Sequence, residues 1–80
     1  MSDYNPYLKR AFLDVVRNQL RDDDPPETRQ TLNRLLAAGY SRQEAIERIG
    51  AAVVEMIWEV WHEHKEFDNE RYRALLDAIE

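Results

Sequence analysis

The stretch SRQEAIERIGAAVVEMIWEVWHEHK, residues 41–65, decides the fold of this 80-residue chain. Ser41 followed three residues later by Glu44 is the pattern of a capping box, which marks a helix start. Beyond it, apolar residues recur three and four positions apart, the period of one helix face. Gly50 is the only weak helix former, and we expect another helix to approach closely there. We therefore predict a long helix over 42–65, with a main buried stripe of Ile46, Ile49, Val53, Ile57, Val60 and His64.

A first helix is predicted over residues 6–21. Asn5 is a favoured cap, and Pro6 fits the first helical position because its missing N–H has no partner there. Gln19 is a polar residue on the apolar face, and we expect it to bond to the loop at 22–26 so that its amide is satisfied. The predicted core face of this helix consists of Leu8, Phe12, Val15 and Gln19.

Two further helices are marked by their ends. Asp24 is the expected cap of a helix over 25–38, which Gly39 ends because glycine adopts positive φ without strain. Asp68 caps a fourth helix over 69–79. We find no alternating strand pattern and no hairpin turn. The predicted fold class is therefore all-α: a compact four-helix domain with a long third helix.

Length and composition fit a single domain over residues 1–80. The chain is 44% hydrophobic, which argues against disorder, and it has no cysteine, which excludes disulfides and thiolate zinc sites. There is no run of about 18 apolar residues that would span a membrane. The start, MSDYNPYLKR, lacks the pattern of a secretory leader, so we expect a cytoplasmic protein.

Charge is unevenly distributed along the chain. Residues 1–40 carry six acidic and six basic residues, whereas residues 41–80 carry ten acidic and five basic ones, which accounts for the net charge of −5. A nucleic-acid partner requires a net basic face, so we do not expect one. The exception is a basic stripe of Arg10, Arg17 and Arg21, which is either a solvated helix face or a docking surface for an acidic partner.

The predicted third helix has a second apolar face. Ala51, Val54, Trp58 and Trp61 lie between its polar side and its main stripe. A chain of this size has difficulty burying a helix on nearly all sides. This face is therefore either covered by the first or fourth helix or forms an interface, most simply with an identical chain in a homodimer.

Chemistry-bearing residues are few. Glu59 and His62 have the E-x-x-H spacing of di-iron carboxylate bundles, and with Glu55 they are the candidates for a metal site. The required second motif is missing, and we expect this face to be solvated. The only serines are Ser2 and Ser41, and no glycine-rich phosphate loop exists. We therefore expect neither an enzyme nor a cofactor.

Five segments of the chain form a distinctive pattern: NPYL (5–8), NQL (18–20), DPPETR (24–29), RLLAAGYSRQEAIERIG (34–50) and DNERYRALL (68–76). In these segments the sequence resembles a bacterial family of uncharacterised small all-helical proteins. It implies the same helical fold and no assigned activity. Family members often carry histidines four apart on the first and third helices, and the corresponding positions here are Lys9, Leu13, Gln43 and Glu47. If those histidines bind metal, the resemblance implies that this chain has lost the site.

A second, shorter resemblance concerns residues 35–46, LLAAGYSRQEAI, which are similar to the helix–loop–helix of ubiquitin-associated domains. That resemblance implies peptide binding through the Gly39–Tyr40 loop. The function predicted from the sequence is a non-enzymatic protein-interaction or regulatory module that self-associates. The alternatives are a metal protein or enzyme at Glu55, Glu59 and His62, and a peptide-binding module.

Overall fold

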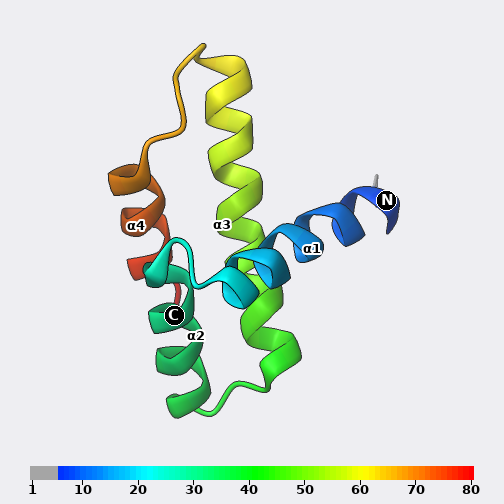
Figure 1. Ribbon diagram of the computed structural model, residues 1–80, viewed down its shortest axis with the longest axis vertical. Coiled ribbons are helices and arrows are strands. Elements are labelled where there is room, and N and C mark those ends of the chain that lie inside the picture. The colour runs from blue at the N-terminus through cyan, green and yellow to red at the C-terminus, as the bar shows by residue number, and fades with distance from the viewer. Residues whose placement is uncertain (1–5) are drawn as a thin grey trace.

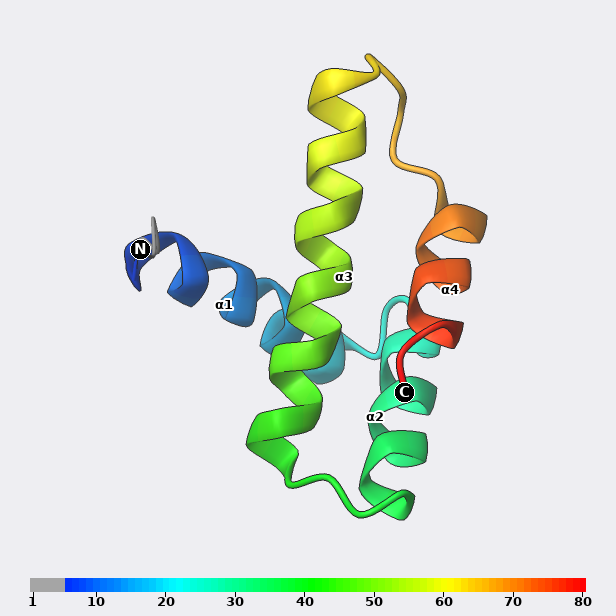
Figure 2. The same ribbon diagram turned by 180° about the vertical axis from the view of Figure 1, so that it is seen from behind.

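Figure 1 shows the computed structural model, which describes residues 6–80 and folds them into four helices with no strand in this range. The helices are α1 (Pro6–Asp22), α2 (Pro26–Ala37), α3 (Arg42–His62) and α4 (Asn69–Asp77). The predicted all-α fold with a long third helix is confirmed. Helix α3 contacts the other three helices; α2 and α4 run beside it, and α1 crosses it (Figures 1 and 2). No helix within residues 6–80 combines the length and apolar character needed to cross a membrane.

The start of α3 is confirmed as a capping box. Ser41 Oγ accepts a hydrogen bond from the Glu44 N–H at 3.1 Å, and Glu44 Oε1 accepts one from the Ser41 N–H at 2.9 Å. The stop before it is also as predicted. Gly39 has φ of +103°, and the Tyr40 N–H bonds the Leu35 carbonyl at 3.1 Å, which satisfies a carbonyl at the end of α2.

The prediction that Asp24 caps the second helix is wrong. Asp23 takes the left-handed conformation with φ of +52°, and the Asp24 N–H bonds the Gln19 carbonyl at 3.1 Å. Asp24 therefore belongs to the closing motif of α1. Helix α2 begins at Pro26 with Pro25 as its N-cap and has no side-chain cap bond.

The predicted extent of the third helix, 42–65, is wrong at its end. Helix α3 stops at His62, where the Glu63 N–H bonds the Glu59 carbonyl at 2.9 Å. His64 has φ of +52° and is exposed, so it does not continue the buried stripe. The chain reverses here because α4 packs back on α3, and helical periodicity carries no signal for that reversal (Figure 1).

Helix α4 begins where predicted. Asp68 Oδ1 accepts the N–H groups of Glu70 at 2.9 Å and Arg71 at 3.3 Å. Phe67, just before the cap, packs its ring against Tyr72 with 5.7 Å between centroids. Helix α4 ends at Asp77, two residues before the expected end at 79.

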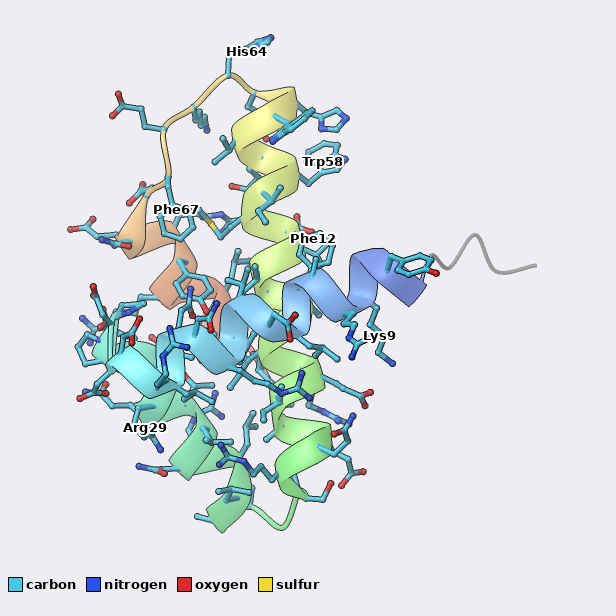
Figure 3. All side chains as sticks on the ribbon, turned by 45° about the vertical axis from the view of Figure 1, so that its right-hand side comes forward. Lys9, Phe12, Arg29, Trp58, His64 and Phe67 are labelled. Atoms are coloured by element: carbon cyan, nitrogen blue, oxygen red, sulfur yellow. The ribbon has the colours of Figure 1, made fainter. Side chains whose placement is uncertain are left out.

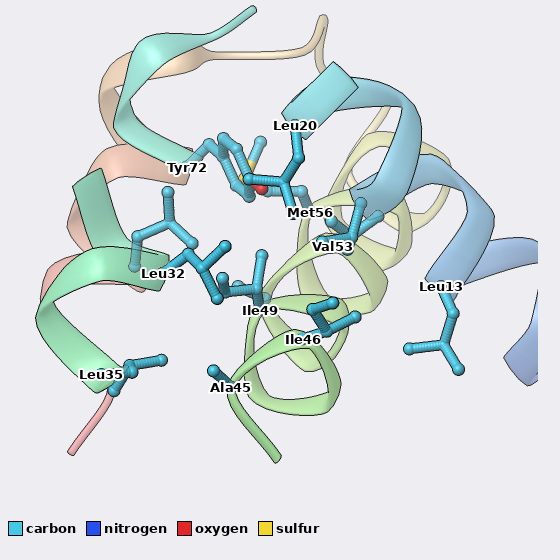
Figure 4. Close-up of a cluster of buried hydrophobic side chains, with 13 residues drawn as sticks. Leu13, Leu20, Leu32, Leu35, Ala45, Ile46, Ile49, Val53, Met56 and Tyr72 are labelled. Atoms are coloured by element: carbon cyan, nitrogen blue, oxygen red, sulfur yellow. The ribbon is translucent and has the colours of Figure 1, made fainter. Parts of the chain in front are cut away.

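The core lies between α3 and the other helices (Figure 4). Three residues of the predicted stripe, Ile46, Ile49 and Val53, are buried, whereas Ile57 and Val60 are only partly buried. The buried hydrophobic residues are Leu13, Val16, Leu20, Leu32, Leu35, Ala45, Ile46, Ile49, Ala52, Val53, Met56, Tyr72 and Leu76.

The core face of α1 is turned by one residue from the prediction, as judged from Phe12 onward; the predicted Asn5 cap and the side chain of Leu8 lie outside the part of the chain that the structure describes. Leu13, Val16 and Leu20 are buried, while Val15 keeps 36% of its surface exposed. Both faces of this helix, the predicted one and the buried one, carry apolar residues, so periodicity alone does not identify the face that packs against the core. Leu13 packs against α3 at Gly50, where an added Cβ would lie 3.5 Å from Leu13 Cδ2. The expected close approach at Gly50 is confirmed.

Candidate interaction surface

An apolar surface runs along the outward face of α3. We call Ala51, Val54, Trp58 and Trp61 the α3 stripe. All four are exposed: Val54 keeps 40% of its surface, Trp58 keeps 50% and Trp61 keeps 75%. Two tryptophans on one exposed helix face are unusual, because this residue type is mostly buried in a chain's own core. That the stripe is an interface stays a prediction.

The stripe lies beside the crossing of α1 over α3. Leu13 against Gly50 marks the crossing, and Lys9 Nζ lies 3.0 Å from Glu47 Oε2 on the same side. The amino-terminal half of α1 then extends past α3, and the carboxy-terminal half of α3 extends past α1 (Figures 1 and 2). We call the angle between residues 7–15 of α1 and 51–61 of α3 the open corner.

Helix α1 adds apolar side chains to the open corner. Phe12 is partly buried against the core and lies between α1 and α3 below Trp58 in Figure 3. Val15 follows three residues later on the same face and is 36% exposed, and Tyr7, on the extending half of α1, is 82% exposed. Both arms of the corner therefore present apolar surface.

His62 lies against Trp58 on the exposed side of α3. Its ring stacks on Trp58 with 4.2 Å between centroids and 12° between planes, and its Nδ1 lies 3.0 Å from the Trp58 carbonyl oxygen. The stack fixes the orientation of the half-exposed indole. The structure thus places His62 beside the α3 stripe, a contact that the metal interpretation of the sequence did not predict.

Glu59 is not on a solvated face, and that expectation is wrong. It is only 8% exposed and accepts two hydrogen bonds from Arg71, whose Nε lies 3.1 Å from Oε1 and whose Nη2 lies 2.8 Å from Oε2. Hydrogen bonds from Arg71 hold the pKa of the Glu59 carboxylate below its usual range, although burial opposes this shift. The pair joins α3 to α4.

The structure does not bring the metal candidates together. Glu59 binds Arg71, His62 stacks on Trp58, and Glu55 is exposed. Within residues 6–80, no group of three or more histidine or carboxylate side chains is placed to hold a metal ion.

Lys9, Leu13, Gln43 and Glu47, the four positions that the resemblance compares with histidines, lie on α1 and α3 where these helices meet. Lys9 and Glu47 form the ion pair between α1 and α3, and Gln43 Nε2 lies 3.4 Å from Glu47 Oε2. Leu13 packs against Gly50 instead. In this chain a hydrophobic contact and an ion pair occupy these positions.

The Gly39–Tyr40 loop makes contacts within the chain. The Tyr40 hydroxyl donates to the main-chain carbonyl of Glu80, and the guanidinium of Arg48 lies 4.2 Å from the centroid of the Tyr40 ring. These contacts use the side chain that a peptide-binding loop would present to its ligand, so the geometry gives the peptide-binding alternative no support.

Gln19 does not bond to the loop at 22–26 through its side chain. Its Oε1 accepts the hydroxyls of Thr28 at 2.8 Å and Tyr72 at 2.9 Å, which links α1, α2 and α4. Burial raises the pKa of the Tyr72 hydroxyl, while its hydrogen bonds to Thr28 and Gln19 oppose the rise. The sequence could have indicated this network, because Gln19, Thr28 and Tyr72 are polar residues at core-facing positions of three helices.

Two hollows between the described helices are small. One of about 110 Å³ lies between α3 and α4 beside Glu59 and Arg71. Another of about 200 Å³ lies between α2 and α4 beside Arg34 and Arg73. Sites for small molecules usually measure about 300–1,000 Å³. Neither hollow competes with the open corner as a candidate site.

The comparison with protein families gives one finding. The family described as "Domain of unknown function (DUF1841)" matches residues 1–78, and the chain belongs to this family. The resemblance to an uncharacterised helical family is thereby confirmed. No curated protein and no solved structure matches the chain.

Proposed function

We propose that this member of the DUF1841 family is a protein-interaction module that performs no catalysis and docks its partner on the α3 stripe. The observation that carries the proposal is the exposure of Trp58 and Trp61, at 50% and 75% of their surfaces, on one helix face. Large aromatic side chains supply much of the binding energy of protein interfaces. Contiguous exposed apolar surface on a small soluble domain is a feature of such interfaces.

The engagement of the polar side chains supports the same function. Glu59 is held by Arg71, and Ser41 caps α3. Gln19, Thr28 and Tyr72 bond one another. These groups serve the fold, and a catalytic site would need a nucleophile or a base aimed into a cavity.

Site-specific photo-crosslinking in cells tests the proposal. A photoreactive phenylalanine analogue replaces Trp61 in one variant and Leu36 in another. Leu36 is a matched control because it is an exposed apolar residue on α2, away from the stripe, at 39% exposure. We expect adducts of defined mass from position 61 and none from position 36. Equal labelling of both positions, or no adduct at 61, would contradict an interaction surface on α3.

A further inference from the structure

We infer that the occupant of the α3 stripe is a second copy of this chain, docked into the open corner so that each copy fills the corner of the other. The inference rests on the proposed function and names its partner. It also extends the docking surface to α1, because Tyr7, Phe12 and Val15 would join the stripe in the contact.

The exposed apolar area matches what a pair of identical chains needs. The exposed fractions are 82% for Tyr7, 75% for Trp61, 50% for Trp58, 40% for Val54 and 36% for Val15. With about 200 Å² for a whole aromatic side chain and about 100 Å² for a valine, these residues expose about 500 Å² per chain. A stable interface of ordinary size buries about 800 Å² per partner, of which about 450–500 Å² is apolar.

The two arms of the corner differ in charge. Residues 7–15 of α1 carry Lys9, Arg10 and Asp14, and residues 51–61 of α3 carry Glu55 and Glu59 and no basic residue. Ion pairs within the chain already engage Lys9, Asp14 and Glu59. The exposed charges that remain are Arg10 on α1 and Glu55 on α3, which have opposite sign. A two-fold axis that lays α1 of one copy along α3 of the other brings a basic and an acidic residue onto facing helices, twice. Charge complementarity of this kind favours pairing in one orientation.

The shape of the chain favours mutual docking. Both helices extend beyond their crossing (Figures 1 and 3). The extending half of α1 in one copy can therefore lie in the open corner of the other copy. In a two-fold dimer the same patch serves both copies, and each residue is used twice. A foreign partner would need to supply both features itself.

Sedimentation velocity over a range of concentrations tests the inference on the whole chain. We expect a dimer that Val54→Glu weakens at least about tenfold, and that Leu36→Glu leaves unchanged. The two residues are matched in exposure, at 40% and 39%, and circular dichroism checks that both variants stay helical. Trp58→Glu is a second stripe variant, expected to behave as Val54→Glu does.

The outcomes separate the two proposals. A chain that stays monomeric up to about 1 mM, or a dimer that responds equally to Val54→Glu and Leu36→Glu, overturns the second copy as occupant. If the monomeric chain still forms adducts with a foreign protein from position 61, only the second copy fails. If position 61 forms no adduct of any kind, both the proposed interaction function and the second copy as its partner are refuted.

Discussion

Removal of the hydroxyl groups around Gln19 should lower stability in unequal steps. Tyr72→Phe and Thr28→Val each delete one of the two O–H donors to Gln19 Oε1, which lie 2.9 Å and 2.8 Å from it. Each single change should reduce the free energy of unfolding by about 1 kcal/mol, the net contribution of a neutral hydrogen bond. Both donors are buried, Tyr72 at 1% and Thr28 at 0% exposure, whereas the acceptor Gln19 is partly buried.

The double variant should lose more than the sum of the singles. Its Gln19 oxygen then has neither donor, and an acceptor left unsatisfied in a buried site costs about 1–3 kcal/mol in addition. Because Gln19 is only partly buried, we expect the lower end of this range and a total loss of about 3 kcal/mol. Adding Gln19→Leu removes the orphaned acceptor and should return most of this additional loss.

Urea unfolding followed by circular dichroism measures these differences. All variants must be compared at one chain concentration, because self-association would raise the apparent stability of the folded state. The coupling between the two sites is read from the double-mutant cycle. The network would be refuted if the free energy of unfolding of the double variant were no lower than that of the less stable single variant. A further loss on adding Gln19→Leu would do the same.

Three other changes test separate parts of the structure. Ser41→Ala should cost about 1 kcal/mol and Asp24→Ala less than about 0.5 kcal/mol, and equal losses in urea unfolding would contradict the cap assignment. Ile49→Ala should cost about 2–5 kcal/mol, because Ile49 is fully buried; a loss below about 0.5 kcal/mol would mean that the site is not core. Arg71 lowers the pKa of Glu59, so this ion pair contributes stability above the usual glutamate range, and the contribution is lost as the pH falls through the lowered pKa. The stability gap between wild type and Glu59→Gln should therefore close on acidification, and a gap independent of pH would count against the pair.

Local signals predicted the helix ends that depend on neighbouring residues. The Ser41 capping box, the Gly39 stop and the Asp68 cap each involve groups within a few residues of one another, so the sequence contains the whole motif. The prediction for Asp24 was wrong because this residue lies between two helix ends, the closing turn of α1 and the start of α2. It follows the closing turn of α1 and precedes α2, and its N–H is used by α1.

Contacts between distant residues could not be predicted in the same way. Glu59 meets Arg71 on another helix, and nothing in the spacing of α3 shows that α4 folds back beside it. Helical period did place Trp58 and Trp61 off the main stripe, and both are exposed. The periodicity of one chain does not encode a partner that would cover them.

Arg34 of α2 donates from its two terminal nitrogens to the carbonyls of Leu76 and Ile79, each at 2.9 Å. The Leu76 carbonyl lies in the last turn of α4 and the Ile79 carbonyl just beyond it, where a helix ordinarily frays because its last carbonyls have no partner. In terms of amide hydrogen exchange, we expect this clamp to slow the opening of the last turn of α4 and to couple it to α2. Arg34→Ala should therefore speed exchange at the end of α4, and unchanged exchange there would contradict the coupling.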